Sequence, residues 1–311
     1  MQKLRGIIVF IFFTALFYFS LFFLLYSIKD DFGKPFIYHT EDYYLQKGGN
    51  AYRTFHNFDR NKQYDIVVLG ASHAYRGYDP RIFNKHGLLL YVLGTSNQSI
   101  INEYFVLKEY IRERTTRLII LDVYDECFLE NGYEFESAAD MIPNLNGSVF
   151  TPLKLAFALN DFRAINMCVM RQFNKPVPAI NLDQKQYIYN GYCENTDSIK
   201  KPVESDKITD QIGSTKLFYL KKLLETAIAS KIKIVAINHP NPNKNYRLQH
   251  EKFMEIIQPI LKSYDVPLLD YAYVLPMDSK NHFYDYTHMN QAGVTIFNEV
   301  LINDLQRLKI L

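Results

Sequence analysis

Cysteine is scarce in this sequence: only Cys127, Cys168 and Cys193 occur among 311 residues. None of them stands in a C-x-x-C or similar spacing, so the usual zinc and dithiol motifs are excluded. Three thiols also cannot form a complete set of disulfides. We therefore expect free thiols and no bound metal; a single Cys168–Cys193 disulfide is the alternative.

Charge of one sign is lacking as well. Lys and Arg total 35 against 33 Asp and Glu, a formal net charge of +2, and no block of five or six basic residues occurs. Such a chain has no patch that would neutralise phosphates, so nucleic acid is not an expected partner. Glycine-rich phosphate loops of the G-x-G-x-x-G or G-x4-G-K-S/T kind are also missing, and no nucleotide cofactor is expected.

One long apolar stretch stands near the N-terminus. From Gly6 to Ile28 the sequence carries no charged side chain, and at about 1.5 Å per residue this stretch can cross a hydrocarbon core of roughly 30 Å. It runs directly into Lys29 without a small-x-small cleavage site, which favours an uncleaved anchor over a signal peptide. We expect residues 1–29 to form a membrane anchor that spans the bilayer with residues 6–28.

The charges that flank this anchor predict its orientation. Lys3 and Arg5 precede the apolar stretch, and positive residues tend to stay on the cytoplasmic side. Lys29 weakens the asymmetry without reversing it. The N-terminus is therefore predicted to be cytoplasmic, and everything after the anchor periplasmic or extracellular.

The remainder of the chain alternates between strand and helix patterns. After an aromatic connector at 30–62, short β-branched or apolar runs indicate buried strands at Tyr64–Gly70, Leu88–Leu93, Arg117–Leu121, Ile232–Asn238 and Val266–Leu269. Apolar residues at helical spacing lie between and after these runs, in 100–111, 217–228 and 291–308. This order predicts an α/β domain at 63–311, a flavodoxin-like three-layer sandwich with about five parallel strands. A region rich in polar residues, Asn, Pro and Gly at about 128–212 is read as an insertion.

Polar residues follow the predicted strands, where parallel α/β sheets bind ligands. Ser72 comes directly after the first strand, behind Gly70, which permits a tight turn into a helix. Near the C-terminus Asp285 and His288 stand three residues apart, immediately before the last helix. In a serine-nucleophile site His288 would remove the hydroxyl proton of Ser72, and Asp285 would orient the imidazole.

Other readings of these residues stay open. Ser72 alone could be a turn or capping residue, and Asp285 with His288 a surface or capping pair. His282, Asp285 and His288 could be imagined as a metal site, although the segment looks like a loop. His73 is expected to pack or cap and not to act as the base, because adjacent side chains diverge.

The two blocks together resemble the SGNH (GDSL-like) hydrolase superfamily, over roughly residues 64–305. The resemblance implies that Ser72 is the nucleophile, that Gly94 lies where a glycine N–H helps to form the oxyanion hole, and that Asn238-His239-Pro240 surrounds the site. His239 is expected either to line the pocket or to be a structural histidine with its hydrogen bonds satisfied. Membrane-tethered variants of this kind imply acyl esters of cell-envelope glycans or teichoic acids as substrates. A membrane acyltransferase is the implied partner.

The sequence also departs from the family pattern. Ala71 replaces the usual Asp before the serine, and the third strand ends in Leu121-Asp122-Val123-Tyr124 without the family's G-x-N-D block. One oxyanion donor is thereby missing, and Asn97 is the candidate substitute. This gap leaves a second hypothesis: a non-catalytic glycan-binding or scaffolding module that keeps the fold. It also leaves hydrolase and transferase activities equally open.

Overall fold

The computed structural model describes residues 2–29, 36, 49–130, 134–172, 188–199, 211–243 and 246–311. Its centre is a five-stranded sheet in the order β2-β1-β3-β4-β5, and every neighbouring pair is parallel. The strands are β1 Tyr64–Gly70, β2 Leu90–Gly94, β3 Thr116–Asp122, β4 Lys233–Asn238 and β5 Leu268–Asp270. The predicted parallel α/β fold is confirmed, with β2 beginning two residues later than expected.

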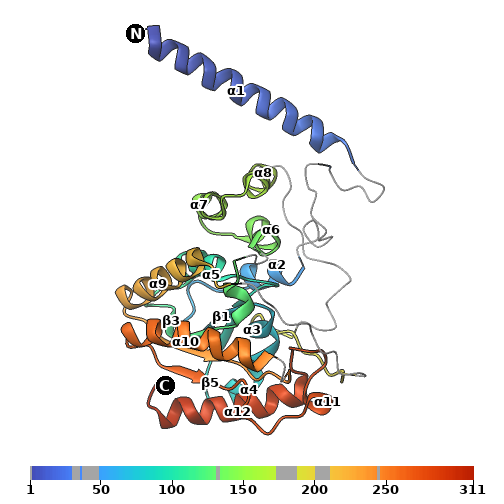
Figure 1. Cartoon of the computed structure of the whole chain (residues 1–311), viewed down its shortest axis with the longest axis vertical. Helices are drawn as coiled ribbons and strands as arrows, with labels where there is room; N and C mark the ends of the chain where they lie inside the picture. The colour runs from blue at the N-terminus through green and yellow to red at the C-terminus, as the bar shows by residue number, and fades with distance from the viewer. Residues whose placement is uncertain are drawn as a thin grey trace.

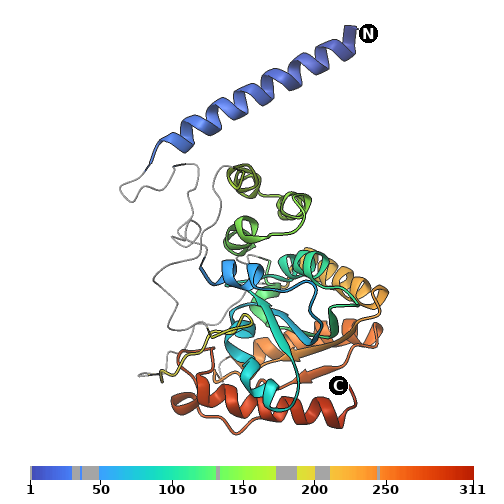
Figure 2. The same ribbon diagram turned by 180° about the vertical axis from the view of Figure 1, so that it is seen from behind.

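Side chains alternate between the two faces of this sheet, as strand geometry requires. Val67 and Ile119 point into one core with α5 (Ile100–Tyr110), α9 (Ser214–Ala229) and α10 (Arg247–Ser263). Ile66 and Ile120 point into the other with α3 (Ser72–Gly77), α4 (Pro80–Lys85) and α12 (Gln291–Arg307). Figures 1 and 2 show the sheet between these two helical layers. Because both faces are buried there, the central parts of β1 to β4 are continuously apolar, and this is why they could be recognised in the sequence.

Part of the expected connector belongs to the core. Residues 49–56 form α2 (Gly49–His56), and Phe55 and Phe58 are almost completely buried. Phe58 stacks on Tyr64 with ring centroids 5.0 Å apart, and Phe55 stacks on Tyr110 at 5.2 Å. The aromatic residues of this segment therefore pack as core residues. The parts of the connector at 30–35 and 37–48 lie outside the described residues.

In the region expected to be an insertion, at about 128–212, the described residues form three helices, which follow a short 3-10 turn at Asp125–Phe128. They are α6 (Glu134–Asn144), α7 (Phe150–Leu159) and α8 (Phe162–Met170). They lie on top of the α5 side of the sheet, between the α/β layers and the N-terminal helix (Figure 1). Residues 131–133, 173–187 and 200–210 of this region lie outside the described part.

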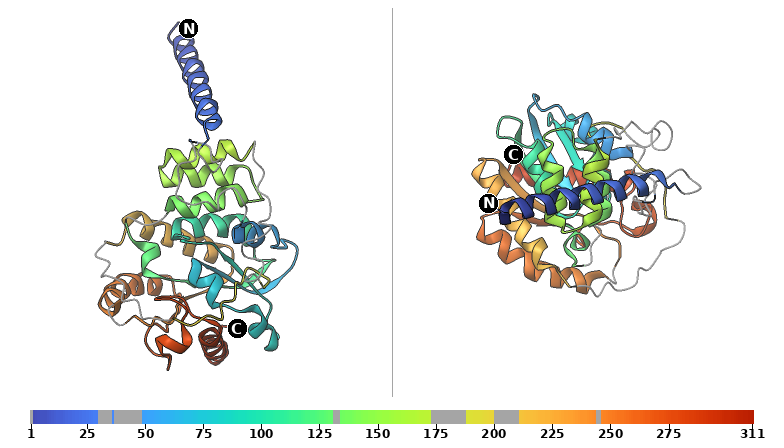
Figure 3. Two further views of the ribbon diagram at one scale, coloured as in Figure 1. Left: turned by 90° about the vertical axis from the view of Figure 1, so that its right-hand side faces the viewer. Right: turned by 90° about the horizontal axis from the view of Figure 1, so that it is seen from above.

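The N-terminal segment is one helix, α1 (Gln2–Ser27), long and apolar enough to cross a membrane. Most of its apolar side chains are exposed. Its second half touches α8: the hydroxyl of Tyr18 donates to Asn166 Oδ1 at 2.7 Å, and Phe22 is buried. Figure 3 shows α1 above the layer that α7 and α8 form.

Candidate active site

Ser72 begins helix α3 at the carboxyl end of β1. The turn before it is tight, because a Cβ on Gly70 would lie 2.7 Å from Ala74 Cβ and 2.8 Å from Asp122 Cβ. Only glycine leaves room for α3 and the end of β3 to approach so closely. The strand-to-helix turn thus places the Ser72 hydroxyl at the edge where the parallel strands end.

The loop before α12 brings Asp285 and His288 to the same edge. Nε2 of His288 lies 2.7 Å from Ser72 Oγ, and Nδ1 of His288 lies 2.9 Å from Asp285 Oδ2. Backbone N–H groups of Thr287 and His288 donate to Asp285 Oδ1 at 2.9 and 2.7 Å. The structure therefore brings Ser72 together with Asp285 and His288, although Ser72 and His288 are 216 positions apart in the sequence.

The surroundings of Asp285 keep its carboxylate ionised. Burial alone would raise its pKa, but hydrogen bonds from the His288 ring and from the Thr287 and His288 backbone outweigh burial, and the pKa is lowered. An ionised carboxylate beside Nδ1 fixes that nitrogen as the protonated one. Nε2 is then the free acceptor that faces Ser72.

His73 lies directly behind His288. Its ring stacks on His288 with centroids 4.3 Å apart and on His239 with centroids 4.0 Å apart. The side chain is buried, and neither ring nitrogen has a hydrogen-bond partner in the described residues. Burial, reinforced by the neighbouring His239, His288 and Arg76, lowers the pKa of His73 well below its usual value. His73 therefore packs, as expected, and lies as a buried neutral ring between His239 and His288.

His239 is held from the far side by Asp122 at the end of β3. Its Nδ1 lies 3.2 Å from Asp122 Oδ1, and Asp122 Oδ2 accepts a hydrogen bond from the Tyr78 hydroxyl at 2.6 Å. His239, the predicted pocket residue, is therefore a buried residue behind His73, and it does not line the described pocket beside Ser72.

A pocket of about 500 Å³, open to solvent, lies in front of Ser72. Asn97 lines it together with Tyr124, Glu126, Lys216 and Tyr286. Asn97 has a left-handed backbone with φ of 51°, a conformation that asparagine tolerates better than most residues. Asn97 thus lines the pocket beside Ser72, and its role as the substitute oxyanion donor stays a prediction.

The glycine expected to contribute to the oxyanion hole, Gly94, ends β2 beside the serine turn. A Cβ there would lie 3.0 Å from the Gly70 carbonyl oxygen and 3.1 Å from that of Ala71. Gly94 is therefore in contact with the turn that carries Ser72, although it is not among the described pocket-lining residues. That the Gly94 N–H donates to the oxyanion stays a prediction.

The sequence analysis did not predict the two charged residues that line the pocket, Lys216 and Glu126. Lys216 is almost completely buried in α9, and its ammonium donates to the Leu129 carbonyl at 2.9 Å. Burial lowers its pKa to about 8. Glu126 accepts a hydrogen bond from the Tyr246 hydroxyl at 2.5 Å. Neither residue stands in a motif, since each reaches the pocket only through the folding of segments between β3 and β4.

The remaining candidates are accounted for as follows. His282 Nδ1 accepts a hydrogen bond from the backbone N–H of Asp278 at 3.0 Å, within α11 (Ser279–His282). No disulfide joins the three cysteines, all of which lie in the described part of the chain, with Cys127 and Cys193 buried and Cys168 partly buried. The prediction of thiols, in place of a Cys168–Cys193 disulfide, is confirmed.

Fold and site together define a parallel α/β protein with a Ser-His-Asp constellation at the carboxyl edge of its sheet. No protein-family model and no curated protein matches the sequence. Among solved structures, the chain is similar to a proposed acylhydrolase from Bacteroides fragilis, with 10% identity over 82% of this chain and 94% of that one, and a TM-score of 0.44.

Two further structures are similar to the same degree. A GDSL-like lipase from Bacteroides thetaiotaomicron shares 11% identity over 78% of this chain and 88% of its own, at a TM-score of 0.42. A lipase/acylhydrolase from Enterococcus faecalis shares 10% identity over 78% of this chain and 95% of its own, at a TM-score of 0.40. The roles assigned below rest on the geometry of this chain's own residues.

Proposed function

We propose that this protein is a membrane-anchored serine esterase or O-acyltransferase of the SGNH type. The observation that carries the proposal is the 2.7 Å approach of His288 Nε2 to Ser72 Oγ, with the Asp285 carboxylate 2.9 Å behind the imidazole. A nucleophile, a base and an orienting acid in this order form the arrangement that acyl transfer through a serine requires.

The proposed reaction has two halves. Ser72 Oγ attacks the ester carbonyl while His288 Nε2 takes its proton, and the resulting imidazolium is stabilised by Asp285. The tetrahedral intermediate collapses, the C–O bond to the alcohol breaks, and His288 returns the proton to the leaving alkoxide. A water molecule or an acceptor hydroxyl then attacks the acyl-serine, with His288 again as base, and Ser72 is released.

The oxyanion needs donors at the start of α3. N–H groups in the first turn of a helix have no partner within the helix, so those of Ser72 and the following residue are available to the developing charge. The amide of Asn97 lines the same pocket and supplies a second kind of donor. Each such donor is typically worth about 3 to 4 kcal/mol of transition-state stabilisation.

The substrate class is the finer part of the proposal. With α1 as an anchor and the N-terminus in the cytoplasm, the α/β domain faces the cell envelope. Acyl esters of envelope glycans, with acetyl the simplest case, are the substrates that the SGNH resemblance implies. A membrane acyltransferase is the corresponding partner. A polar pocket with Asn97, Glu126 and Lys216 on its wall suits a hydroxyl-rich substrate better than a long acyl chain.

The test measures the hydrolysis of a small chromogenic acetyl ester by the full chain in detergent micelles. Ser72→Ala and His288→Ala are expected to lower kcat on the order of 10⁴-fold or more, and Asp285→Asn to a similar degree. Ser96→Ala is the matched control, because Ser96 also follows a strand but is absent from the pocket lining. Its activity should remain at the wild-type level.

A negative result is informative if folding is checked by circular dichroism. A folded chain that shows no turnover, and whose Ser72 is not labelled by a serine-directed phosphonate, would refute the catalytic proposal. The non-catalytic glycan-binding module would then be favoured. Labelling of Ser72 without hydrolysis would instead favour transfer to an acceptor that the assay lacks.

A further inference from the structure

Helix α7 carries an apolar stripe on its outer side. Phe150, Leu153 and Phe157 recur at helical spacing and are exposed, with Phe150 64% and Phe157 65% accessible. Phe162, at the start of α8, is 83% accessible. Helices of soluble domains usually turn their polar side outward, and contiguous exposed aromatic residues mark a binding surface. We call Val149, Phe150, Leu153, Phe157 and Phe162 the α7 stripe.

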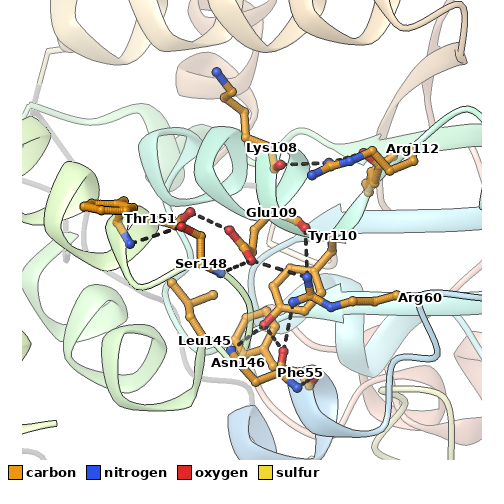
Figure 4. A network of polar contacts seen from close by, with 12 residues as sticks. Phe55, Arg60, Lys108, Glu109, Tyr110, Arg112, Leu145, Asn146, Ser148 and Thr151 are labelled. Carbon is orange, nitrogen blue, oxygen red and sulfur yellow. Dashed lines mark hydrogen bonds and ion pairs between the residues drawn. The ribbon is translucent and has the colours of Figure 1, made fainter. Parts of the chain in front are cut away.

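The inner side of α7 is fixed to the core, so the stripe has a defined direction. Glu109 of α5 accepts hydrogen bonds from the Ser148 N–H, at 2.6 Å, and from the Thr151 hydroxyl, at the two sides of the helix start. Arg60 lies 3.3 Å from the same carboxylate (Figure 4). Leu155 and Ala156 are buried on the inner side. These contacts leave the stripe outside, on a helix that is held in place.

The same layer touches the anchor helix. Tyr18 of α1 bonds to Asn166 of α8, and Tyr18 lies ten positions before Ile28, about 15 Å along a helix axis. If the apolar stretch of α1 crosses a core of roughly 30 Å, Tyr18 lies near the middle of that core. The α8 side chain that meets it must reach the same depth. The α7 and α8 layer therefore cannot stand clear of the bilayer.

We infer that the α7 stripe is a lipid-binding surface that seats the α/β domain on the membrane beside its own anchor. The inference rests on the proposed membrane anchoring through α1. Phe150, Phe157 and Phe162 enter the acyl-chain region beside α1, where their apolar surface is removed from water. Lys154 is exposed on the same side and meets the headgroup phosphates.

Attachment to the membrane through both α1 and the α7 stripe fixes the orientation of the α/β domain. A single helix followed by a linker would let the domain rotate, whereas α1 and the α7 stripe together define a plane. The pocket beside Ser72 is then held at a constant height and angle to the membrane. A substrate delivered from the membrane surface would meet the site in one orientation.

The chain contains no tryptophan, which permits single-tryptophan reporters in the full chain reconstituted in lipid nanodiscs. Phe157→Trp and Phe162→Trp report on the stripe, and Phe13→Trp on the anchor. Val274→Trp is the control, since Val274 is 68% exposed and stands four residues after the end of β5. Figure 1 shows β5 on the opposite side of the domain from α7 and α8. Fluorescence is compared between lipids with and without bromine on the acyl chains, and with aqueous iodide.

The contact of Tyr18 with Asn166 places the layer at the depth of the acyl chains. Bromine on the acyl chains should therefore quench Phe157→Trp and Phe162→Trp, and Val274→Trp should respond to iodide alone. Quenching of Phe13→Trp by brominated lipid, with Phe157→Trp open to iodide, would overturn the inference and leave the anchor intact. Shielding of Phe157→Trp from both quenchers would assign the stripe to a protein partner and equally overturn it. A Phe13→Trp that no lipid bromine reaches would refute the anchoring itself.

Discussion

At the residue scale, the three-histidine stack is the least expected part of the site. His73 adjoins the proposed nucleophile in sequence, yet it contributes a buried neutral ring between His239 and His288. A protonated His73 would place a positive charge against the imidazolium that His288 becomes during the proposed reaction. Keeping His73 neutral removes this repulsion and leaves a flat surface that limits the rotation of His288.

The stack predicts acid sensitivity. Because burial lowers the pKa of His73 in the folded protein, the unfolded chain binds a proton that the folded chain does not once the pH falls below about 6.5. The free energy of unfolding should therefore decrease as the pH falls through this window, by at most about 1.4 kcal/mol per pH unit from His73. His73→Phe keeps a flat ring without the titration, and its loss of stability between pH 7 and pH 5 should be smaller.

Thermal unfolding followed by circular dichroism at several pH values measures this difference. Asp125, whose pKa burial raises to about 6, acts in the opposite direction but is present in both proteins, so it cancels in the comparison. Parallel pH profiles for wild type and His73→Phe would contradict the assignment of His73 as a buried neutral residue.

The residue scale also shows where sequence reasoning ends. Ser72, Asp285 and His288 could be predicted because each stands next to a recognisable strand end or helix start. Tyr78 and Asp122 could not be predicted, because their hydrogen bond joins positions 44 residues apart and neither stands in a motif. Local patterns reveal which residues carry chemistry, whereas the residues that support them are chosen by packing.

At the scale of elements, the junction of β1 and α3 is the most constrained part of the site. Gly70→Ala would push a Cβ against Ala74 and Asp122 at under 3 Å, and such overpacking typically costs about 1 to 3 kcal/mol. The substitution should also displace Ser72 from His288. We expect reduced stability and a loss of ester turnover larger than the loss of stability explains.

Gly77→Ala is the control for this substitution, at the other end of α3. A Cβ there would meet only Met289 Cε, at 3.4 Å, and methionine adapts easily. Thermal unfolding and ester turnover of both variants measure the effect. Equal behaviour of Gly70→Ala and Gly77→Ala would show that the close approach at Gly70 does not position the serine.

Elements differed in how well the sequence revealed them. The buried strands were found because two covered faces demand continuous apolar runs, and α12 because its apolar stripe faces one core. α6, α7 and α8 were read only as an insertion. Their contacts are with one another, with α2, with α5 and with α1. The outer side of α7 is apolar as well as its inner side, so the usual alternation of apolar and polar faces does not mark α7.

At the scale of the whole molecule, the α/β domain, the α6 to α8 layer and α1 follow one another along one direction (Figure 3). The Ser72 site belongs to the α/β domain, and the α7 stripe belongs to the α6 to α8 layer. The apolar helix and the α/β domain could each be predicted from the sequence. The contact between α1 and α8 could not be predicted, because a hydrogen bond such as that from Tyr18 to Asn166 produces no periodic pattern in either segment.

The orientation of the anchor gives a prediction for the whole chain. Lys3 and Arg5 precede the apolar stretch of α1, with Lys29 after it, so the positive-inside rule places the α/β domain outside the cytoplasm. A reporter that is active only outside the cytoplasm, fused after Leu311, should be active, and one that needs the cytoplasm should be silent.

Replacement of Lys3 and Arg5 by Glu removes the basic side chains before the span and leaves Lys29 as the nearest one after it. Part of the population should then invert and the two reporter signals should move in opposite directions. A cytoplasmic signal from the unaltered chain would overturn the topology, and with it the proposed access of Ser72 to envelope esters, while leaving the geometry of Ser72, His288 and Asp285 to be tested on cytoplasmic esters instead.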